Sequence, residues 1–338
     1  MPQAYKPSAV ATLDACIEDL KKCHEPATQD QYRSGVRKFK KFLQQMCPTL
    51  EFPLREIDWC MFCQWMKDDE KLALGTIKNY QTHVAFVMEC CGYEIPRWTE
   101  MPRLRRLRKR RKGLSEAKAK KKQPIDYGLA KNLVDIVPED DADANIFCMT
   151  LLLGIAGFFR LGELLIKNKS GYDLKRVIRS GHIQFFPDRH DIPNLTHLTF
   201  FLPYSKVDKY GFGITIIIPC HEDPKYCPVR RAAHATKHLR PTDPVLCWPN
   251  GTLMTKDSFI KKLRCHLQDL DIDPTQFSGH SLRRGAAVSA KAAGAGEELI
   301  KMLGRWSSDA YKIYLNHIPR HVQRLNDMLL LMGVAQTG

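Results

Sequence analysis

Apolar positions recur every three or four residues between residues 25 and 97, which is the period of amphipathic helices. Thr28, Asp58 and Thr76 are expected to cap three such helices, and Gly92 is expected to end the last. Their apolar faces consist of Tyr32, Val36, Phe39 and Leu43, then Trp59, Phe62 and Met66, and finally Ile77, Tyr80, Val84, Val87 and Cys91. The pattern therefore predicts a small all-helical domain over residues 25–97.

The hydrophobic pattern changes its period in the second part of the chain. Asp126 is expected to start a helix, and the very apolar stretch from Ile146 to Phe159 is expected to form another. Short segments rich in branched and aromatic residues, typical of β-strands, follow at 182–186, 198–202 and 213–219. Helical spacing then predicts helices at 228–239, 256–270, 281–293, 297–304, 307–316 and 320–333. The predicted fold class is mainly α with a small antiparallel β-sheet (α+β).

Positive charge is concentrated in one segment. The 338 residues carry a net charge of +15, and residues 103–122 supply +11 of it, because they contain twelve Lys or Arg and one acid. Such a segment attracts polyanions, nucleic acid first, and can also serve as a nuclear localisation signal. We interpret residues 98–124 as a basic linker that is too polar for a core, with a first part that can form a helix end before the linker proper begins after Gly113. Its candidate DNA-binding residues are Arg103, Arg105, Arg106, Arg108, Lys109, Arg110, Arg111 and Lys112.

The linker separates the helical domain from a second domain over residues 125–338, and an extension of residues 1–24 precedes both. The twelve cysteines are dispersed and follow no signal peptide, so we expect reduced thiols rather than a disulfide framework. The longest apolar run, Ile146 to Phe159, is shorter than the roughly 18 residues of a spanning helix, so no membrane partner is expected.

Several side chains suited to binding a phosphodiester are scattered over the second domain. Arg160 precedes Glu163 by three residues, which fits either a structural ion pair or a guanidinium oriented for phosphate. His280 and Arg283 share one face at the start of a predicted helix, where backbone N–H groups also favour an anion. Lys206 lies in a predicted hairpin turn, where a lysine is normally just solvated.

The segments GFFRLGELL, YSKVDKYGFG, SGHSLRRGAA and LGRWSSDAYKIYLNHI resemble, in order and wording, the catalytic region of tyrosine recombinases. They are most similar to recombinases of eukaryotic DIRS-like, Ngaro-like and Crypton-like mobile elements. The resemblance covers about residues 125–320 well and residues 25–97 in pattern only. It implies a DNA breaking-rejoining catalytic domain preceded by a helical core-binding (SAM-like) domain.

The resemblance also implies residue roles. Tyr314 would be the nucleophile, with Tyr311 as the alternative, because the spacing from Trp306 to Tyr314 is one residue shorter than is usual in the family. Lys206 would be the general acid, with Lys209 as its runner-up. The remaining catalytic residues would be Arg160, His280, Arg283 and Trp306, supported by Glu163.

The implied activity is site-specific DNA recombination through a 3′-phosphotyrosine, without metal, ATP or another cofactor. The implied partners are double-stranded DNA and further copies of the chain, as a homo-tetramer on two DNA sites, and the expected location is the nucleus. Two alternatives share these features: a domesticated DNA-binding protein that does not cut, and a type IB topoisomerase-like nicking and relaxing enzyme. A zinc site at Cys220, Cys227, His234 and His238 is a weaker alternative, because the spacing between the two cysteines is longer than is usual for zinc and the two histidines fit one face of a helix starting at Pro228.

Overall fold

The chain forms two compact units, residues 1–119 and residues 120–338. The structure, a computed structural model, describes residues 26–47, 50, 53–114, 122–138, 140–167, 173–205, 208 and 211–312. Each unit has its own hydrophobic core. Within the described part of the chain, every helix is too short or too polar to span a bilayer.

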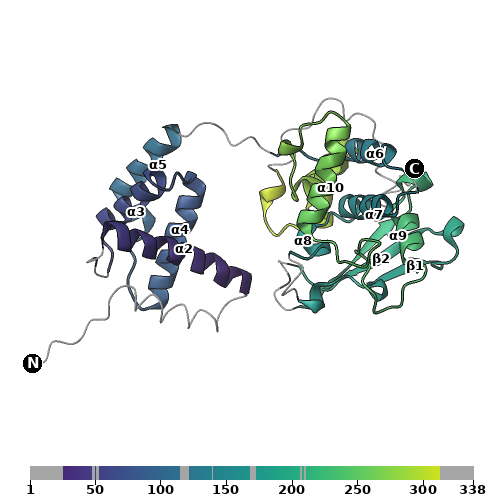
Figure 1. Cartoon of the computed structure of the whole chain (residues 1–338), viewed down its shortest axis with the longest axis horizontal. Coiled ribbons are helices and arrows are strands. Elements are labelled where there is room, and N and C mark those ends of the chain that lie inside the picture. Colours follow the sequence, from purple (N-terminus) through teal and green to yellow (C-terminus); the bar gives the residue numbers. More distant parts are fainter. Residues whose placement is uncertain are drawn as a thin grey trace, which may run out of the picture. The chain divides into compact units, whose positions relative to one another are not determined.

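In its described residues, the first unit is a cluster of the four helices α2 to α5 (Figure 1). Its core is rich in stacked aromatic side chains, with Phe39, Trp59 and Phe62 fully buried. The ring centroids of Phe39 and Phe62 are 4.9 Å apart, a distance at which aromatic pairs attract one another beyond simple burial. The helices are α2 (Pro26–Met46), α3 (Glu56–Asp68), α4 (Leu74–Cys90) and α5 (Pro102–Leu114), with a 3-10 turn at Trp98–Glu100.

All three expected helix starts lie elsewhere, the first because α2 begins at Pro26 and so contains Thr28. Helix α4 begins at Leu74 instead of at Thr76, with Ala73 as its N-cap. Helix α3 begins before Asp58, and the Asp58 carboxylate accepts a hydrogen bond from the backbone N–H of Arg55 at 2.8 Å. Asp58 therefore stabilises the helix start from inside the first turn, as the acidic partner of a capping box.

The segment expected to be a linker from residue 98 is different in its first half. Residues 102–114 form helix α5, and the buried Met101 and Leu104 join the core of the first unit. The Glu56 carboxylate accepts hydrogen bonds from the backbone N–H groups of Arg103 and Leu104, which fixes the start of α5. A basic run with leucines at helical spacing thus folds as a helix, because one narrow apolar side is enough to dock it.

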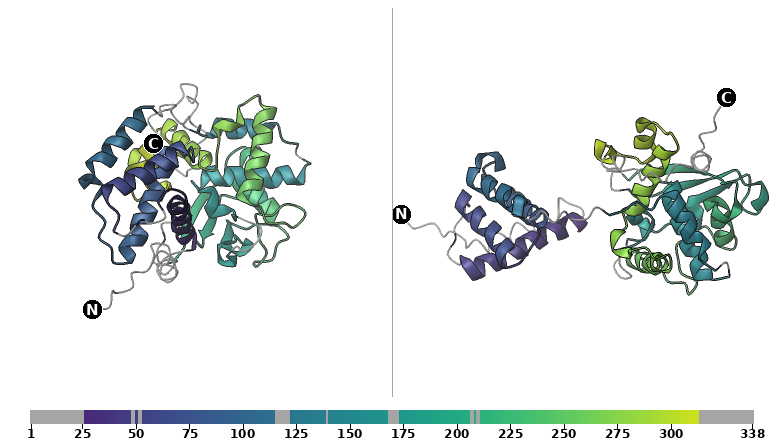
Figure 2. Two further views of the ribbon diagram at one scale, coloured as in Figure 1. Left: turned by 60° about the vertical axis from the view of Figure 1, so that its left-hand side comes forward. Right: turned by 90° about the horizontal axis from the view of Figure 1, so that it is seen from above.

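In its described residues, the second unit combines helices with a three-stranded sheet (Figure 2). The strands β1 (Ile183–Phe186), β2 (His197–Leu202) and β3 (Ile214–Pro219) pair antiparallel in the order β1-β2-β3. Helix α9 packs against β3 and against α7. This agrees with the predicted fold class. The helices of the second unit are α6 (Tyr127–Asp135), α7 (Ala142–Ala156), α8 (Leu161–Leu164), α9 (Pro228–Thr236), α10 (Lys256–Asp269), α11 (Ser281–Ala292) and α12 (Glu297–Leu303).

Small residues let helix α11 approach the chain closely. Ile125 donates its backbone N–H to the Ser281 carbonyl at 2.9 Å, and a Cβ added at Gly285 would clash with the Ile125 carbonyl. This close approach explains why the sequence runs Gly-Ala-Ala at the start of α11. It also holds His280 and Arg283, which begin the same helix, against the core of the second unit.

The last predicted helices are described only in part. Of the stretch 307–316, the described residues contain a short 3-10 turn at Asp309–Tyr311, and the stretch 320–333 lies outside the described residues. Nine of the described cysteines carry reduced thiols, whereas Cys91, part-exposed at the end of α4, is disulfide-bonded. The expectation of reduced thiols is therefore wrong for Cys91.

Candidate active site

Arg160 and Glu163 form a tight pair at the start of α8. The buried helix α7 ends at Ala156, and Phe158 then adopts a left-handed backbone with φ of 51°, which turns the chain into Arg160. Arg160 Nη1 lies 2.6 Å from Glu163 Oε1, and the Arg160 backbone N–H donates to Glu163 Oε2 at 2.9 Å. The Glu163 side chain is only 3% exposed, while that of Arg160 is 24% exposed. The Glu163 carboxylate therefore fixes the position of Arg160, whose side chain remains partly exposed to solvent.

Arg283 reaches the same carboxylate from helix α11. Its Nη1 lies 3.8 Å from Glu163 Oε2, and its side chain is 3% exposed. It also donates hydrogen bonds to the carbonyl oxygens of Phe158, at 3.1 Å, and Gly304. Two arginines far apart in the sequence, Arg160 and Arg283, thus come together on one buried acid.

A third arginine, Arg305, joins them, and the sequence interpretation missed it. Arg305 Nη2 lies 3.2 Å from Glu163 Oε2, and the guanidinium also donates to the carbonyl oxygens of Gly157 and Phe158 at 2.9 and 3.2 Å. Its side chain is 9% exposed, and its backbone is left-handed with φ of 54°. Its position beside Trp306, in the LGRW segment, was the available signal. We call Arg160, Glu163, Arg283 and Arg305 the arginine cluster.

The arginine cluster has an excess of positive charge. Burial alone would raise the pKa of Glu163, but the backbone N–H of Arg160 and the charges of Arg305 and Arg160 outweigh it, so the pKa is lowered. Glu163 is therefore ionised at neutral pH and offsets one of three guanidinium charges. Partly buried guanidinium groups are costly without an anion, and they match the oxygens of a phosphate.

The sheet hairpin also begins at this cluster. Ser205 follows β2, is buried, and donates its hydroxyl to Glu163 Oε1 at 3.3 Å. Lys206 is the next residue, and it lies outside the described residues, as does Lys209. The backbone therefore reaches the arginine cluster at Ser205, one residue before the predicted general acid Lys206.

His280 lies at the start of α11 among the same cations. Burial lowers its pKa, and the nearby charges of Arg160, Arg283, Arg284 and Lys256 lower it further. The imidazole is consequently neutral at pH 7, where it can accept a proton. The charges of Arg160 and Arg283 therefore act on His280, which lies three residues before Arg283 at the start of α11.

Trp306 and Tyr311 pack together beside Arg283. The guanidinium carbon of Arg283 lies 4.5 Å from the centroid of the Trp306 ring, and the Trp306 and Tyr311 ring centroids are 5.7 Å apart. A Cβ at Gly304 would clash with the Trp306 ring, so a glycine is needed there. Tyr311 is 3% exposed and belongs to the hydrophobic core. Tyr314 lies outside the described residues.

The candidate DNA-binding residues of α5 differ in their surroundings. Arg108 turns into its own unit: it donates to the buried Gln81 side chain and lies 4.8 Å from the centroid of the Trp98 ring. It is thus part of the packing of the helical unit. The side chains of Arg111 and Lys112 are outside the described part. The candidate DNA-binding residues with exposed side chains are Arg103, Arg105, Arg106, Lys109 and Arg110.

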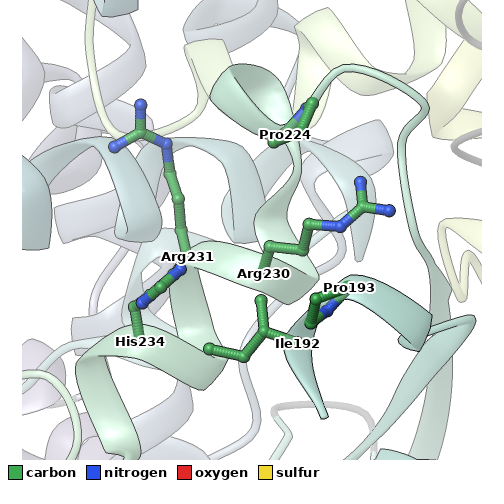
Figure 3. A pocket seen from close by; sticks show the side chains of 6 residues that line it. All are labelled: Ile192, Pro193, Pro224, Arg230, Arg231 and His234. Atoms are coloured by element: carbon green, nitrogen blue, oxygen red, sulfur yellow. The ribbon is translucent and has the colours of Figure 1, made fainter.

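The four residues considered for zinc do not converge. Cys227 is the N-cap of α9, and its buried thiol hydrogen-bonds with that of Cys220. His234 lies seven residues further along, and a helix rises roughly 10 Å over that length. Among the described residues, no group of three or more potential ligands could hold a metal. His234 instead faces a pocket of about 440 Å³, lined also by Ile192, Pro193, Pro224, Arg230 and Arg231 (Figure 3).

The fold is that of several solved recombinases. A dimer of λ integrase bound to a COC′ core site aligns with 91% of this chain and 95% of its own, at 12% identity and a TM-score of 0.61. XerH bound to its palindromic difH substrate aligns with 93% of this chain and 82% of its own, at 12% identity and a TM-score of 0.60. The Tn1549 transposon integrase in complex with transposon right end DNA aligns with 94% of this chain and 98% of its own, at 12% identity and a TM-score of 0.57.

Sequence comparison alone finds no relative. No protein-family model matches the chain, and no curated protein matches it. The identities of 12% mean that the similarity extends over the fold and little of the sequence. The chain has the fold of the tyrosine recombinases and integrases, with a small antiparallel sheet in a mainly helical second unit.

Proposed function

We propose that the chain is a tyrosine recombinase, which cuts and rejoins DNA strands through a covalent 3′-phosphotyrosine. One observation carries the proposal: Arg160 and Arg283 meet at the buried Glu163, in a fold shared with DNA-bound recombinases. Paired guanidinium groups at such a place suit the nonbridging oxygens of a phosphodiester, whose negative charge grows in the transition state.

The proposed reaction uses side chains alone. Arg160 and Arg283 hold the nonbridging oxygens, and the Tyr314 phenol attacks phosphorus while a basic group such as the neutral His280 accepts its proton. The bond from phosphorus to the 5′ oxygen breaks, and Lys206 protonates that oxygen as it leaves. Trp306 contributes an N–H donor. Attack by a 5′ hydroxyl of a second DNA strand releases the tyrosine, so no ATP or metal is consumed.

Tyr314 is a better candidate for the nucleophile than Tyr311. The Tyr311 ring is buried in the core beside Trp306, and a residue used for packing has little freedom to reach a phosphate. Tyr314 is three residues further along and follows the turn that carries Tyr311. This geometry favours the sequence-based choice, which rested on motif wording alone.

We propose duplex DNA as the partner, with a homo-tetramer assembled on two sites. The exposed arginines and lysine of α5 would contact phosphates without reading sequence, and would make binding depend on salt. The likeness of the catalytic motifs to DIRS-like, Ngaro-like and Crypton-like recombinases supports an origin in a eukaryotic mobile element and a nuclear location.

A nicked suicide substrate tests the proposal. Because the target sequence is unknown, the full chain is incubated with a pool of nicked duplexes of random sequence, and DNA bound covalently to protein is recovered under denaturing conditions. Wild type should trap a sequence-restricted subset, and Tyr314→Phe should trap none. DNA binding without any trapped adduct would point to a DNA-binding protein that does not cut. Relaxation of supercoils without strand exchange would point to a topoisomerase.

A further inference from the structure

Lys256 is a cation beside the arginine cluster that the proposed mechanism leaves unused. It is the first residue of α10, and its backbone N–H donates to the Ile166 carbonyl at 3.0 Å. This bond, together with the parallel bridge between Ile166 and Thr255, ties the start of α10 to the chain that leaves α8. The main chain thus fixes where the Lys256 side chain begins.

The side chain of Lys256 lies against α8 at Gly162. A Cβ added at Gly162 would lie 2.5 Å from Lys256 Nζ and 2.8 Å from its Cε. Only glycine leaves room there for the ammonium group in this position. Gly162 follows Arg160 by two residues and directly precedes Glu163, so the ammonium is held beside the arginine cluster.

The surroundings of Lys256 are positive. Burial lowers its pKa, and the charges of Lys167 and Arg176 lower it further, while Asp257 opposes them. The charge of Lys256 also helps to lower the pKa of His280. Among the described residues, no carboxylate forms an ion pair with Lys256. A half-buried ammonium group among like charges is unfavourable until an anion arrives.

We infer that Lys256 Nζ binds a phosphate oxygen of the DNA backbone, and so extends the arginine cluster into a longer anion site across α8 and the start of α10. The inference rests on the proposed function for the identity of the anion. Lys256 would be a binding residue that draws the duplex onto Arg160 and His280. Lys206, and not Lys256, would remain the proton donor.

Salt dependence of DNA binding tests this role apart from chemistry. The full chain, Lys256→Gln and Lys262→Gln are titrated against a labelled duplex at several salt concentrations. Lys262 is the matched control, because it lies on the same helix and already faces Asp141 at 3.8 Å. We expect Lys256→Gln to reduce the slope of log affinity against log salt by about 0.9, the value for one lost phosphate contact. Lys262→Gln should leave the slope unchanged.

Two further variants separate binding from a purely structural effect. Lys256→Arg keeps the charge and should restore most of the slope. Gly162→Ala keeps the lysine but pushes its ammonium away, and should weaken binding with little loss of thermal stability. Equal slopes for wild type and Lys256→Gln would overturn the inference, as would a failure of Lys256→Arg to restore binding.

The same series also reports on the proposed function separately. If wild type forms no covalent adduct with any duplex while the slopes still differ, the phosphate site stands and the recombinase chemistry fails. If wild type forms adducts and Lys256→Gln matches it in both slope and adduct yield, the recombinase chemistry stands and the Lys256 site fails.

Discussion

Glu163 is a single carboxylate that faces three guanidinium groups in a buried place. It accepts from Arg160 through both the side chain and the backbone, and it lies within 3.8 Å of Arg283 and 3.2 Å of Arg305. Arg283 and Arg305 have further ties as well, because both donate a hydrogen bond to the Phe158 carbonyl. Glu163 therefore sets the position of the arginines without itself reaching a substrate.

Removing the charge of Glu163 should destabilise the second unit strongly. Glu163→Gln leaves three guanidinium groups without their acid, and breaking a buried pair in this way costs about 3–5 kcal/mol. Calorimetric unfolding of the full chain should show the loss in the transition of residues 120–338. Asp135→Asn is the control, because Asp135 pairs with Lys225 at a side-chain exposure of 42% and should cost less than about 1 kcal/mol. A similar loss in both variants would contradict this view of Glu163.

The lowered pKa of His280 predicts a dependence of stability on pH. The unfolded chain protonates this histidine near pH 6.5, while the folded protein resists protonation because of burial and the charge of Arg160. The unfolded state therefore binds more protons, and the free energy of unfolding falls as the pH drops through about 6.5. His280→Gln should lose less stability than wild type between pH 7.5 and 5.5. The exposed His238 serves as control, and His238→Gln should behave as wild type.

Some of the arginine cluster could be predicted at the level of single residues. Arg160 and Glu163 are three residues apart, and Arg283 shares a helix face with His280, so local spacing pointed to them. Arg305 could not be found in this way, because its partners Gly157, Phe158 and Glu163 are more than a hundred residues distant and its importance comes from a turn that only the fold creates.

Helix α5 shows how the same basic segment serves two purposes. One side carries Leu104 and Arg108 against the helical unit, where Arg108 hydrogen-bonds with Gln81. The other side exposes side chains such as Arg106 and Lys109. A run of cations that composition alone suggested to be a linker is thus half packing and half charged surface.

Two substitutions on α5 should therefore affect different properties, one the stability of the helical unit and the other the binding of DNA. Arg108→Ala leaves the buried Gln81 amide oxygen without its donor and should destabilise the helical unit by about 1–3 kcal/mol. Arg106→Ala should leave stability unchanged and reduce the salt slope of DNA binding by about 0.9. Thermal unfolding and salt titration of both variants measure the two effects. The reverse pattern would show that Arg108 contacts DNA and Arg106 supports the helix.

The elements were easier to predict than their ends. Strands β1 to β3 and helices α10 to α12 lie within a residue or two of the predicted ranges, because period and composition mark a strand or a helix clearly. Helix starts such as that of α4 at Leu74 were missed, since Ala73 offers no side-chain cap to find in the sequence. Helix α5 was missed as a packed element because its apolar side is narrow.

At the scale of the whole chain, the fold could be predicted from motifs in the second unit, whereas the first unit offered only a helical pattern. Solved recombinases align with over nine-tenths of the chain at 12% identity, so the structural similarity extends over both units. Many different sequences have the pattern of buried residues that specifies this fold. Strand cleavage, in contrast, requires particular side chains around one phosphate. A recombinase of this class is therefore identified by the residue that becomes attached to DNA.

Mass spectrometry of the trapped protein–DNA adduct measures that attachment most directly. Wild type, Tyr314→Phe and Tyr311→Phe are incubated with the nicked duplex pool, the DNA is digested, and the modified peptide is identified. The account predicts a phosphonucleotide on Tyr314 in wild type and in any Tyr311→Phe protein that folds, and none in Tyr314→Phe. A modification on Tyr311 or on a serine, or the absence of any adduct from folded wild type that binds DNA, would contradict it.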